Sequence, residues 1–139
     1  MNKIRSIALG KAGELRVASE LLLRGNDVYF NSADSGVDLI LGSGKKIQVK
    51  VAYSSAVKDY WECRRYVFSF KSWRKVDKHY EPHNLAGVDY VILWAINDNV
   101  FFVIPAEKIR GRLAVSLNPI STKQQSEYML FKDKWDSLK

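Results

Sequence analysis

The stretch from residue 36 to residue 50, GVDLILGSGKKIQVK, constrains the fold most, because it predicts a β-hairpin together with its register. Two strand-like runs, VDLIL and IQVKV, flank a Gly-Ser-Gly turn. Polar side chains interrupt both runs: Asp38 lies in the first, and Gln48 and Lys50 lie in the second. Strand interiors normally keep such groups out of the core, so their placement needs a physical explanation.

The alternation of strand side chains provides one explanation. Successive residues of a strand point to opposite faces, so Gln48 and Lys50 share a side, and Asp38 lies opposite its apolar neighbours. Burying the apolar sets of both strands on one face requires an even register sum, which places Asp38 directly across from Gln48 or Lys50. Cross-strand neighbours have Cβ atoms roughly 5 to 8 Å apart. We therefore expect the three polar groups to converge on one face.

A helix predicted over residues 8–25, which ends at a glycine, adds a fourth polar group. Its period places Glu14 in one stripe with four apolar residues, Val17, Ala18, Leu21 and Leu22. A carboxylate in a buried stripe needs a cation, either Lys50 or a metal ion. Two carboxylates, the Gln48 amide oxygen and the Val49 carbonyl form an oxygen-rich set that suits Mg²⁺ or Mn²⁺ and does not suit zinc.

Two interpretations of these polar residues stay open. An antiparallel sheet often has one face in water, and on such a face Asp38, Gln48 and Lys50 would simply be solvated. Glu14 favours a functional site instead. A lysine beside a metal ion supplies fixed positive charge where a phosphate oxygen or an attacking water develops negative charge. The pattern then indicates metal-assisted hydrolysis of a phosphodiester bond.

Length and composition restrict the class of protein. A chain of 139 residues predicts a single domain, 1–139, with a core of its own. The 22 Lys and Arg residues exceed the 15 Asp and Glu residues, and the net charge of +7 favours a polyanionic partner such as nucleic acid. A single cysteine, Cys63, cannot form an internal disulfide, which favours a reducing, cytoplasmic setting. No run approaches the roughly eighteen apolar residues of a membrane span.

Further elements follow from composition and turn signals. Strands are predicted at DVYFN (27–31), RRYVFSF (64–70), GVDYVILWAI (87–96), NVFFVIP (99–105) and LAVSL (113–117). Asn97 to Asn99 predict a second hairpin turn, and a short helix is expected from Pro105 or Ala106 to Ile109. Residues 57–63 are ambiguous, 71–84 indicate a loop with some helix, and YMLFKDKWDSL (128–138) is expected to pack over the core.

Basic residues alternate with aromatic residues from residue 60 to residue 83. This mixture suits phosphate contact combined with stacking, although the aromatics could equally be core residues and the charges a solvated rim. The candidate DNA contacts are Lys71, Arg74, Lys75 and Lys78, with Lys45 and Lys46 at the tip of the first hairpin. His79 and His83 are spaced like helical zinc ligands, but Pro82 and the lack of another ligand pair argue against zinc.

Three stretches, GKAGELRVASELLLRG, GVDLIL and KIQVK, resemble the PD-(D/E)XK nuclease superfamily. In this resemblance Asp38 takes the place of the strand aspartate, Gln48 that of the variable acidic residue, Lys50 that of the lysine, and Glu14 that of the first-helix glutamate. The downstream GVDYVILWAINDNVFFVIPAEKI is similar to the strand, strand and short helix of small members. The chain looks closest to group I intron-encoded endonucleases, some of which carry glutamine at the variable position, and to archaeal Holliday junction resolvases.

The resemblance implies an α/β fold with a restriction-endonuclease-like core, in which helices flank a central mixed β-sheet and the N-terminal helix carries Glu14. It implies a Mg²⁺- or Mn²⁺-dependent DNA endonuclease, homing-type or junction-resolving, that acts on duplex or branched DNA as a homodimer or homotetramer. Asp38, Gln48 and Val49 would ligate the metal, Lys50 would orient the attacking water, and Glu14 would bind metal or orient Lys50. A neutral Gln48 weakens the hold on a divalent ion. An inactive nucleic-acid-binding protein on the same fold is therefore the alternative, and a structural subunit with exposed hairpin polar groups is a third.

Overall fold

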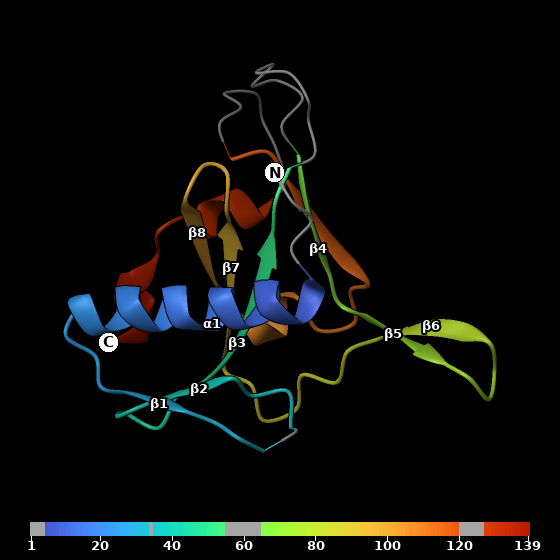
Figure 1. Cartoon of the computed structure of the whole chain (residues 1–139), viewed down its shortest axis with the longest axis horizontal. Coiled ribbons are helices and arrows are strands. Elements are labelled where there is room, and N and C mark those ends of the chain that lie inside the picture. Colours follow the sequence, from blue (N-terminus) through green and yellow to red (C-terminus); the bar gives the residue numbers. More distant parts are fainter. Residues whose placement is uncertain (1–4, 34, 55–64, 120–126) are drawn as a thin grey trace.

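The computed structural model describes residues 5–33, 35–54, 65–119 and 127–139. A mixed five-stranded sheet with the order β1-β2-β3-β7-β8 forms its centre (Figure 1). Its strands are β1 (Val28–Phe30), β2 (Leu39–Leu41), β3 (Lys46–Ala52), β7 (Tyr90–Ala95) and β8 (Val100–Pro105). β3 and β7 run parallel, and the other neighbouring strands of this sheet are antiparallel. The α/β fold with a central mixed sheet and an N-terminal helix is thus confirmed.

Helix α1 (Ser6–Leu23) lies across one face of the sheet (Figure 1). It buries Gly13, Val17, Ala18 and Leu21 against the apolar side chains of β2, β3, β7 and β8, together with the 3₁₀ helix η4 (Trp135–Leu138). A Cβ atom at residue 13 would collide with a methyl carbon of Val51, so the glycine allows α1 to approach β3 closely. The stripe prediction was wrong for Leu22, which is 55% exposed, and it missed Gly13.

The opposite face of the sheet is covered by a two-stranded sheet of β4 (Tyr66–Ser69) and β9 (Ala114–Leu117). Buried residues of these strands pack with those of β7 and β8 and with Tyr128 of the 3₁₀ helix η3 (Glu127–Phe131). The short 3₁₀ helix η2 (Ala106–Lys108) follows β8 directly, as the proline at the end of that strand predicts. Helical segments therefore lie on both faces, and the strands predicted from the sequence are all present.

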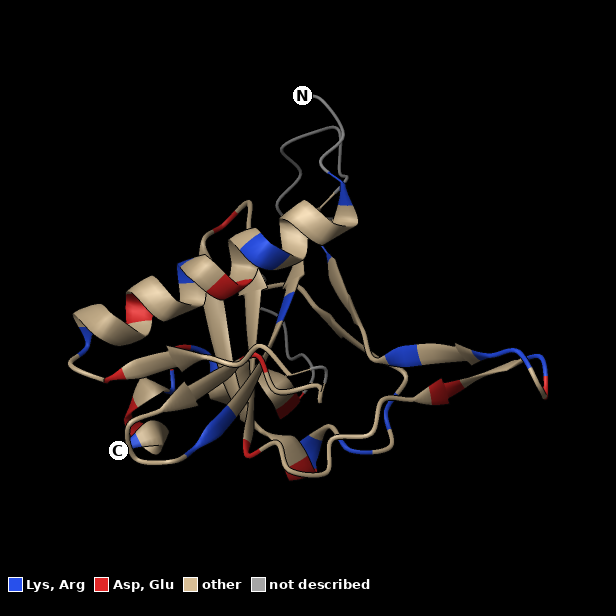
Figure 2. Cartoon of the chain, turned by 60° about the horizontal axis from the view of Figure 1, so that its bottom comes forward, with Lys and Arg blue, Asp and Glu red and all other residues tan. Residues whose placement is uncertain are grey.

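Residues 71–84 differ from their expected loop with some helix, because they form a hairpin of β5 (Lys71–Arg74) and β6 (His79–Pro82). Two features favour strands here: Trp73 packs edge-on against Tyr80 across the hairpin, and Lys78 in the turn adopts a positive φ of 50°. The hairpin projects away from the rest of the molecule (Figure 2). The ambiguous residues 57–63, including Cys63, lie outside the described residues.

No helix among residues 5–33, 35–54, 65–119 and 127–139 is both long enough and apolar enough to cross a membrane.

Candidate functional site

The predicted even register of the first hairpin is confirmed, and it places Asp38 at a special position. Leu39 pairs with Ile47, and Ile40 pairs with Lys46, so Asp38, which directly precedes the first residue of β2, comes opposite Gln48. The Asp38 backbone N–H still donates to the Ile47 carbonyl (2.8 Å), and the Asp38 carboxylate Oδ2 accepts the Val49 N–H at 2.7 Å. The carboxylate thus takes the place that a backbone carbonyl would have if β2 continued.

A loop residue holds Asp38 from its other side. The Asn31 backbone N–H donates to the Asp38 carbonyl (3.0 Å), while the Asn31 side chain donates to the Val37 carbonyl (2.8 Å). Main-chain hydrogen bonds on both sides therefore fix the carboxylate at the open edge of β3. Because the N–H and C=O of one strand residue point to the same side of the strand, the Val49 carbonyl faces this open edge as well.

The sequence predicted Asp38, Gln48 and Lys50 on one face and added Glu14 from the helix, and the structure shows that Glu14 approaches from the opposite face of the sheet. Gln48 and Lys50 point away from α1, toward the β4–β9 side of the sheet, because α1 packs on Ile47 and Val49. Glu14 comes from the α1 side. Glu14 is close enough to Asp38 for the Glu14 charge to act on the Asp38 carboxylate. The two can meet because β2 begins only at Leu39 and leaves the edge of β3 beyond it unpaired. The cluster therefore forms around a strand edge.

Charges in this cluster perturb each other. Burial is the largest cause that raises the pKa of Asp38, and the neighbouring Glu14 carboxylate raises it further, whereas the Val49 N–H and the Lys50 charge lower it. Burial lowers the pKa of Lys50, and the Asp38 charge partly offsets that effect. Two carboxylates are thus held together in a partly buried place, which a cation between them would relieve. Lys11 supplies some compensation at the surface, where its Nζ lies 3.2 Å from Glu14 Oε2.

Gln48 is the buried polar member of the site. Its side chain is 8% exposed, and its Oε1 atom has no hydrogen-bond partner among the described residues. An unpartnered buried oxygen costs free energy comparable to a lost hydrogen bond, roughly 1 to 3 kcal/mol. Gln48 lies on the strand that also carries Val49 and Lys50, and its unpartnered oxygen is a candidate ligand.

The residues present fit an oxygen-preferring divalent ion. Asp38 and Glu14 supply carboxylates, Gln48 an orphan amide oxygen and Val49 a carbonyl that faces the same edge. Within the described residues there is no group of three His, Cys, Asp or Glu side chains placed to hold a metal. A site with two carboxylates fits Mg²⁺, which commonly keeps several waters and binds through one or two carboxylates and the substrate phosphates.

Lys50 has an aromatic neighbour that the sequence did not identify. Its Nζ lies 5.6 Å from the centre of the Phe70 ring, and Phe70, which is fully buried, meets the His83 ring edge-on at 6.3 Å. His83 Nε2 lies 3.1 Å from the Lys71 carbonyl. Burial and then the Lys50 charge lower the pKa of His83. No local sequence signal reveals this neighbour, because the β5–β6 hairpin brings residue 83 back beside residue 70.

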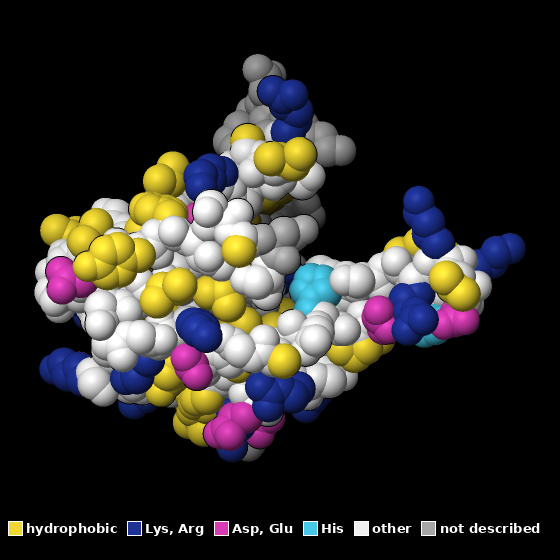
Figure 3. Space-filling model, turned by 90° about the horizontal axis from the view of Figure 1, so that it is seen from below, with side chains coloured by type: hydrophobic (Ala, Val, Ile, Leu, Met, Phe, Trp, Pro, Cys, Tyr) yellow, Lys and Arg dark blue, Asp and Glu magenta, His cyan; other side chains and the backbone are white. Residues whose placement is uncertain are grey.

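The candidate DNA contacts fall in two separate places. Lys71, Arg74, Lys75 and Lys78 are exposed on the β5–β6 hairpin, which stands out from the body in a view from below (Figure 3). Lys46 is exposed at the start of β3. Lys45 is engaged instead, because its Nζ donates to the carbonyls of Leu138 (2.8 Å) and Lys139 (3.0 Å). The tip of the first hairpin is thereby tied to the C-terminal residues.

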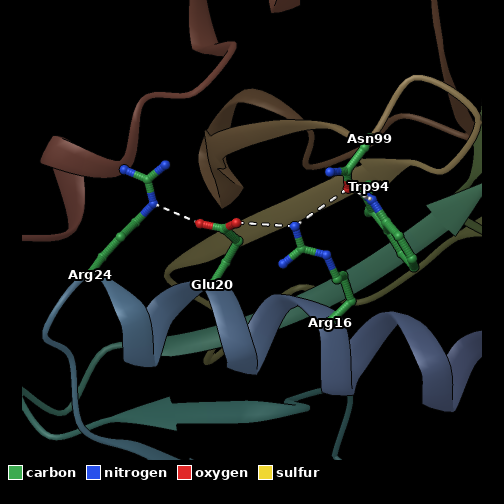
Figure 4. Close-up of polar contacts among 5 residues, drawn as sticks. All are labelled: Arg16, Glu20, Arg24, Trp94 and Asn99. Atoms are coloured by element: carbon green, nitrogen blue, oxygen red, sulfur yellow. Dashed lines mark hydrogen bonds and ion pairs between the residues drawn. The ribbon is translucent and has the colours of Figure 1, made fainter.

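A set of side-chain contacts holds the helix that carries Glu14 (Figure 4). Glu20 accepts from Arg16 (3.0 Å) and from Arg24 (3.1 Å). Burial opposes the effect, but these two guanidinium groups leave the pKa of Glu20 below its ordinary value. Arg16 also lies 3.5 Å from Asn99 Oδ1, which accepts the Trp94 indole N–H at 3.0 Å. The contacts join α1 to the β7–β8 turn and so fix the position of the helix over the sheet.

Comparison of the sequence with known protein families finds no match, and comparison with curated proteins finds none either. The structure is similar to that of the bacterial homing endonuclease I-Ssp6803I, with a TM-score of 0.78 and 18% sequence identity over 96% of this chain and 93% of that chain. It also matches MepB over 89% of this chain and 93% of that chain, with a TM-score of 0.45 and 13% identity. The chain therefore has the fold of a homing endonuclease.

Proposed function

We propose that the chain is a divalent-metal-dependent DNA endonuclease that hydrolyses phosphodiester bonds, with Glu14, Asp38, Gln48 and Lys50 as its site residues. One observation carries the proposal: at the open edge of β3, the Glu14 carboxylate and the partly buried Lys50 ammonium both lie close enough to the Asp38 carboxylate for their charges to act on it. Gln48 of the same strand adds a buried amide oxygen without a hydrogen-bond partner. The fold supports it, because the structure is similar to a homing endonuclease over nearly the whole chain. The basic composition suits a DNA partner.

The chain's own groups would divide the work as follows. Asp38, held by the Val49 N–H, and Gln48 would hold a Mg²⁺ or Mn²⁺ ion together with the Val49 carbonyl, and Glu14 would complete or orient the set. Such an ion would supply acidification of water and positive charge for the scissile phosphate. Lys50 places its ammonium beside the same phosphate, where it stabilises developing negative charge and orients the water. Phe70 limits where that ammonium can lie.

The substrate stays open between two forms of DNA. A homing-type enzyme cuts both strands of a duplex, whereas a junction-resolving enzyme cuts a four-way junction. Either reaction needs two sites related by symmetry, so we propose a homodimer or homotetramer. Light scattering coupled to size-exclusion chromatography measures this directly, and a monomer at micromolar concentration in the presence of DNA would contradict it.

The test uses purified protein with supercoiled plasmid, a four-way junction and single-stranded DNA, each in Mg²⁺ or Mn²⁺. Asp38→Ala and Lys50→Ala should each reduce the cleavage rate at least about 10²-fold, because the first removes a metal ligand and the second removes positive charge beside the phosphate. Lys108→Ala removes an exposed positive charge away from the site and should cleave like the wild type. DNA affinity measured in Ca²⁺ should change little in the Asp38 variant.

The neutral Gln48 favours a second candidate, an inactive protein that binds nucleic acid on this fold. If the wild type binds all three DNA forms but cuts none with either ion, the enzyme proposal fails and this second candidate stands. If it neither cuts nor binds, and affinity shows no dependence on salt, the nucleic-acid partner is refuted as well.

A further inference from the structure

The β5–β6 hairpin leaves the body of the molecule directly beside the candidate site. Its ladder pairs Lys71 with Pro82 at one end and Arg74 with His79 at the other. Below that ladder, the His83 N–H donates to the Phe70 carbonyl at 2.7 Å, and Phe70 is the ring under Lys50. The hairpin therefore begins at the aromatic ring that neighbours the candidate catalytic lysine and extends outward from there (Figure 2).

The two faces of this hairpin carry different chemistry. Residues directly opposite each other in an antiparallel pair point to the same face, so the register assigns each side chain of β5 and β6 to one of the two faces of the hairpin. One face, which we name the aromatic face, carries Lys71, Trp73, Tyr80 and Pro82. The other, which we name the ion-pair face, carries Ser72, Arg74, His79 and Glu81.

Positive charge on the ion-pair face is already compensated. Arg74 lies 3.3 Å from the Glu81 carboxylate and 3.4 Å from that of Asp77 in the turn. These two are the acidic residues of the hairpin, so its net charge of +2 rests on the three lysines. Lys71 belongs to the aromatic face, and Lys75 and Lys78 lie in the turn. The positive charge available to a polyanion is therefore that of the three lysines, because Arg74 is already paired with carboxylates.

The aromatic face exposes two large rings to water. Trp73 is 51% and Tyr80 is 52% exposed, and the two rings meet edge-on at 5.0 Å. Lys71 Nζ lies 4.4 Å from the centre of the Tyr80 ring. This pairing stabilises a hairpin that would be marginal alone, because a two-stranded hairpin has no core. Half of each ring is nevertheless left for contact with another molecule, flanked by a lysine.

We propose that the aromatic face enters the major groove of duplex DNA and contacts base edges, while Lys75 and Lys78 contact phosphates. The major groove, about 12 Å wide, admits a two-stranded β-ribbon, and four-residue strands are about 13 Å long. Trp73 and Tyr80 supply apolar contact to bases, and Lys71 supplies a donor for guanine. The proposal rests on the proposed function in taking DNA as the substrate, and it adds which surface reads it.

The test compares two duplexes of one mixed sequence of about 40 base pairs. In the second duplex every cytosine carries a glucosylated 5-hydroxymethyl group, which fills the major groove and leaves the phosphates unchanged. Binding is measured by fluorescence anisotropy in Ca²⁺. The wild type should bind the modified duplex about tenfold more weakly or worse, because base contacts are lost while phosphate contacts stay.

A pair of matched variants assigns the effect to one face. Trp73→Val/Tyr80→Val changes the aromatic face, and Ser72→Val/His79→Val changes the ion-pair face at neighbouring positions of the same strands; valine favours strands in both. Amide hydrogen exchange over residues 71–82 monitors the hairpin. The first variant should bind the unmodified duplex about tenfold more weakly and lose the discrimination between duplexes, and the second should stay within about twofold of the wild type.

Equal wild-type binding to both duplexes would overturn the inference without any variant. Wild-type affinity in the Trp73→Val/Tyr80→Val protein, or an equal loss in both variants, would overturn it as well. These outcomes leave the endonuclease proposal intact, provided that plasmid is still cleaved. Absence of DNA binding by the wild type to either duplex or to plasmid would instead refute both proposals.

Discussion

The site at the edge of β3 and the β5–β6 hairpin are both rich in polar groups, but they hold them under opposite conditions. At the site, Asp38 and Lys50 are partly buried. Burial raises the pKa of Asp38 and lowers the pKa of Lys50, so it favours the neutral form of both side chains. On the hairpin, Arg74 pairs with carboxylates that are about half exposed to solvent. Charge costs free energy in the first region and almost none in the second.

The difference indicates what each region can tell about function. A chain gains no stability from two neighbouring carboxylates and an orphan amide oxygen, so their presence at the site points to a use beyond folding. Exposed ion pairs on a hairpin carry no such information. There the informative residues are Trp73 and Tyr80, which keep half their surface in water although the rest of the hairpin offers no core.

Among the variants that test this comparison, Gln48→Glu should change the stability of the protein most, because it adds a third carboxylate to the partly buried site. Without divalent metal, the free energy of unfolding should fall by about 3 kcal/mol. In Mg²⁺ the melting temperature should rise more than that of the wild type does. Thermal unfolding with and without Mg²⁺ measures both effects. Gln48→Met, which keeps the volume and removes the ligand, is the control, and an equal Mg²⁺ shift in both variants would contradict the metal site.

Gly13→Ala tests the packing that brings α1 and Glu14 to the site. The added Cβ would collide with Val51, so we expect the free energy of unfolding to fall by about 2 kcal/mol. Gly10→Ala is a matched control in the same helix, where nothing lies within 4 Å of the new carbon. It should stabilise the protein by roughly 0.5 to 1 kcal/mol. Chemical denaturation of the two variants compares them, and an equal gain in both would show that the close approach is not needed.

Asp38→Asn should abolish cleavage and yet stabilise the protein by about 1 kcal/mol at pH 7, because it removes a buried charge beside Glu14. The Asp38 pKa is raised in the folded state, so the wild type loses stability as pH rises from the ordinary value of 3.8 through the folded-state pKa. The advantage of the asparagine variant should therefore vanish as pH falls through that window. Denaturation curves from pH 3 to pH 8 test the sign. Asp136→Asn, at an exposed ion pair, should show no such trend.

Arg74→Ala should have the smallest effect, because it breaks two exposed ion pairs on the hairpin. We expect a change of at most about 0.5 kcal/mol in the free energy of unfolding. DNA affinity should also change less than in a Lys75→Ala/Lys78→Ala variant, since the two carboxylates already compensate Arg74. Anisotropy at two salt concentrations makes the comparison. A larger loss for Arg74→Ala would place the DNA contact on the ion-pair face.

Much of the fold follows from local patterns in the sequence. The hairpin register was predictable because a one-residue slip would turn Asp38, Gln48 and Lys50 toward α1, where Ile47 and Val49 pack. The second hairpin was predictable from Asn97 to Asn99 between two apolar runs. Residues 71–84 misled the prediction, because Pro82 and the many charges indicate a loop, whereas the edge-on contact of Trp73 with Tyr80 favours strands only once the two are paired.

The site was less accessible from sequence than the fold. Alternation identified Gln48 and Lys50 as sharing a face, but it could not show that β2 begins only at Leu39. The open strand edge, the Val49 N–H bound to Asp38 and the approach of Glu14 from the other face all depend on this late start of β2. Phe70 and His83 beside Lys50 depend on how the β5–β6 hairpin returns to the body, which is a tertiary property.

The hydrogen bond between the Asp38 carboxylate and the Val49 N–H also bears on how the protein behaves at high concentration. An unpaired stretch of strand is a template on which another chain can add, which is a common route to aggregation. Here a charged side chain occupies a donor that an incoming strand would use, which opposes edge-to-edge pairing at this position. Asp38→Ala would then expose that donor, and such a variant should be studied in dilute solution, with its solubility compared to that of Asp38→Asn.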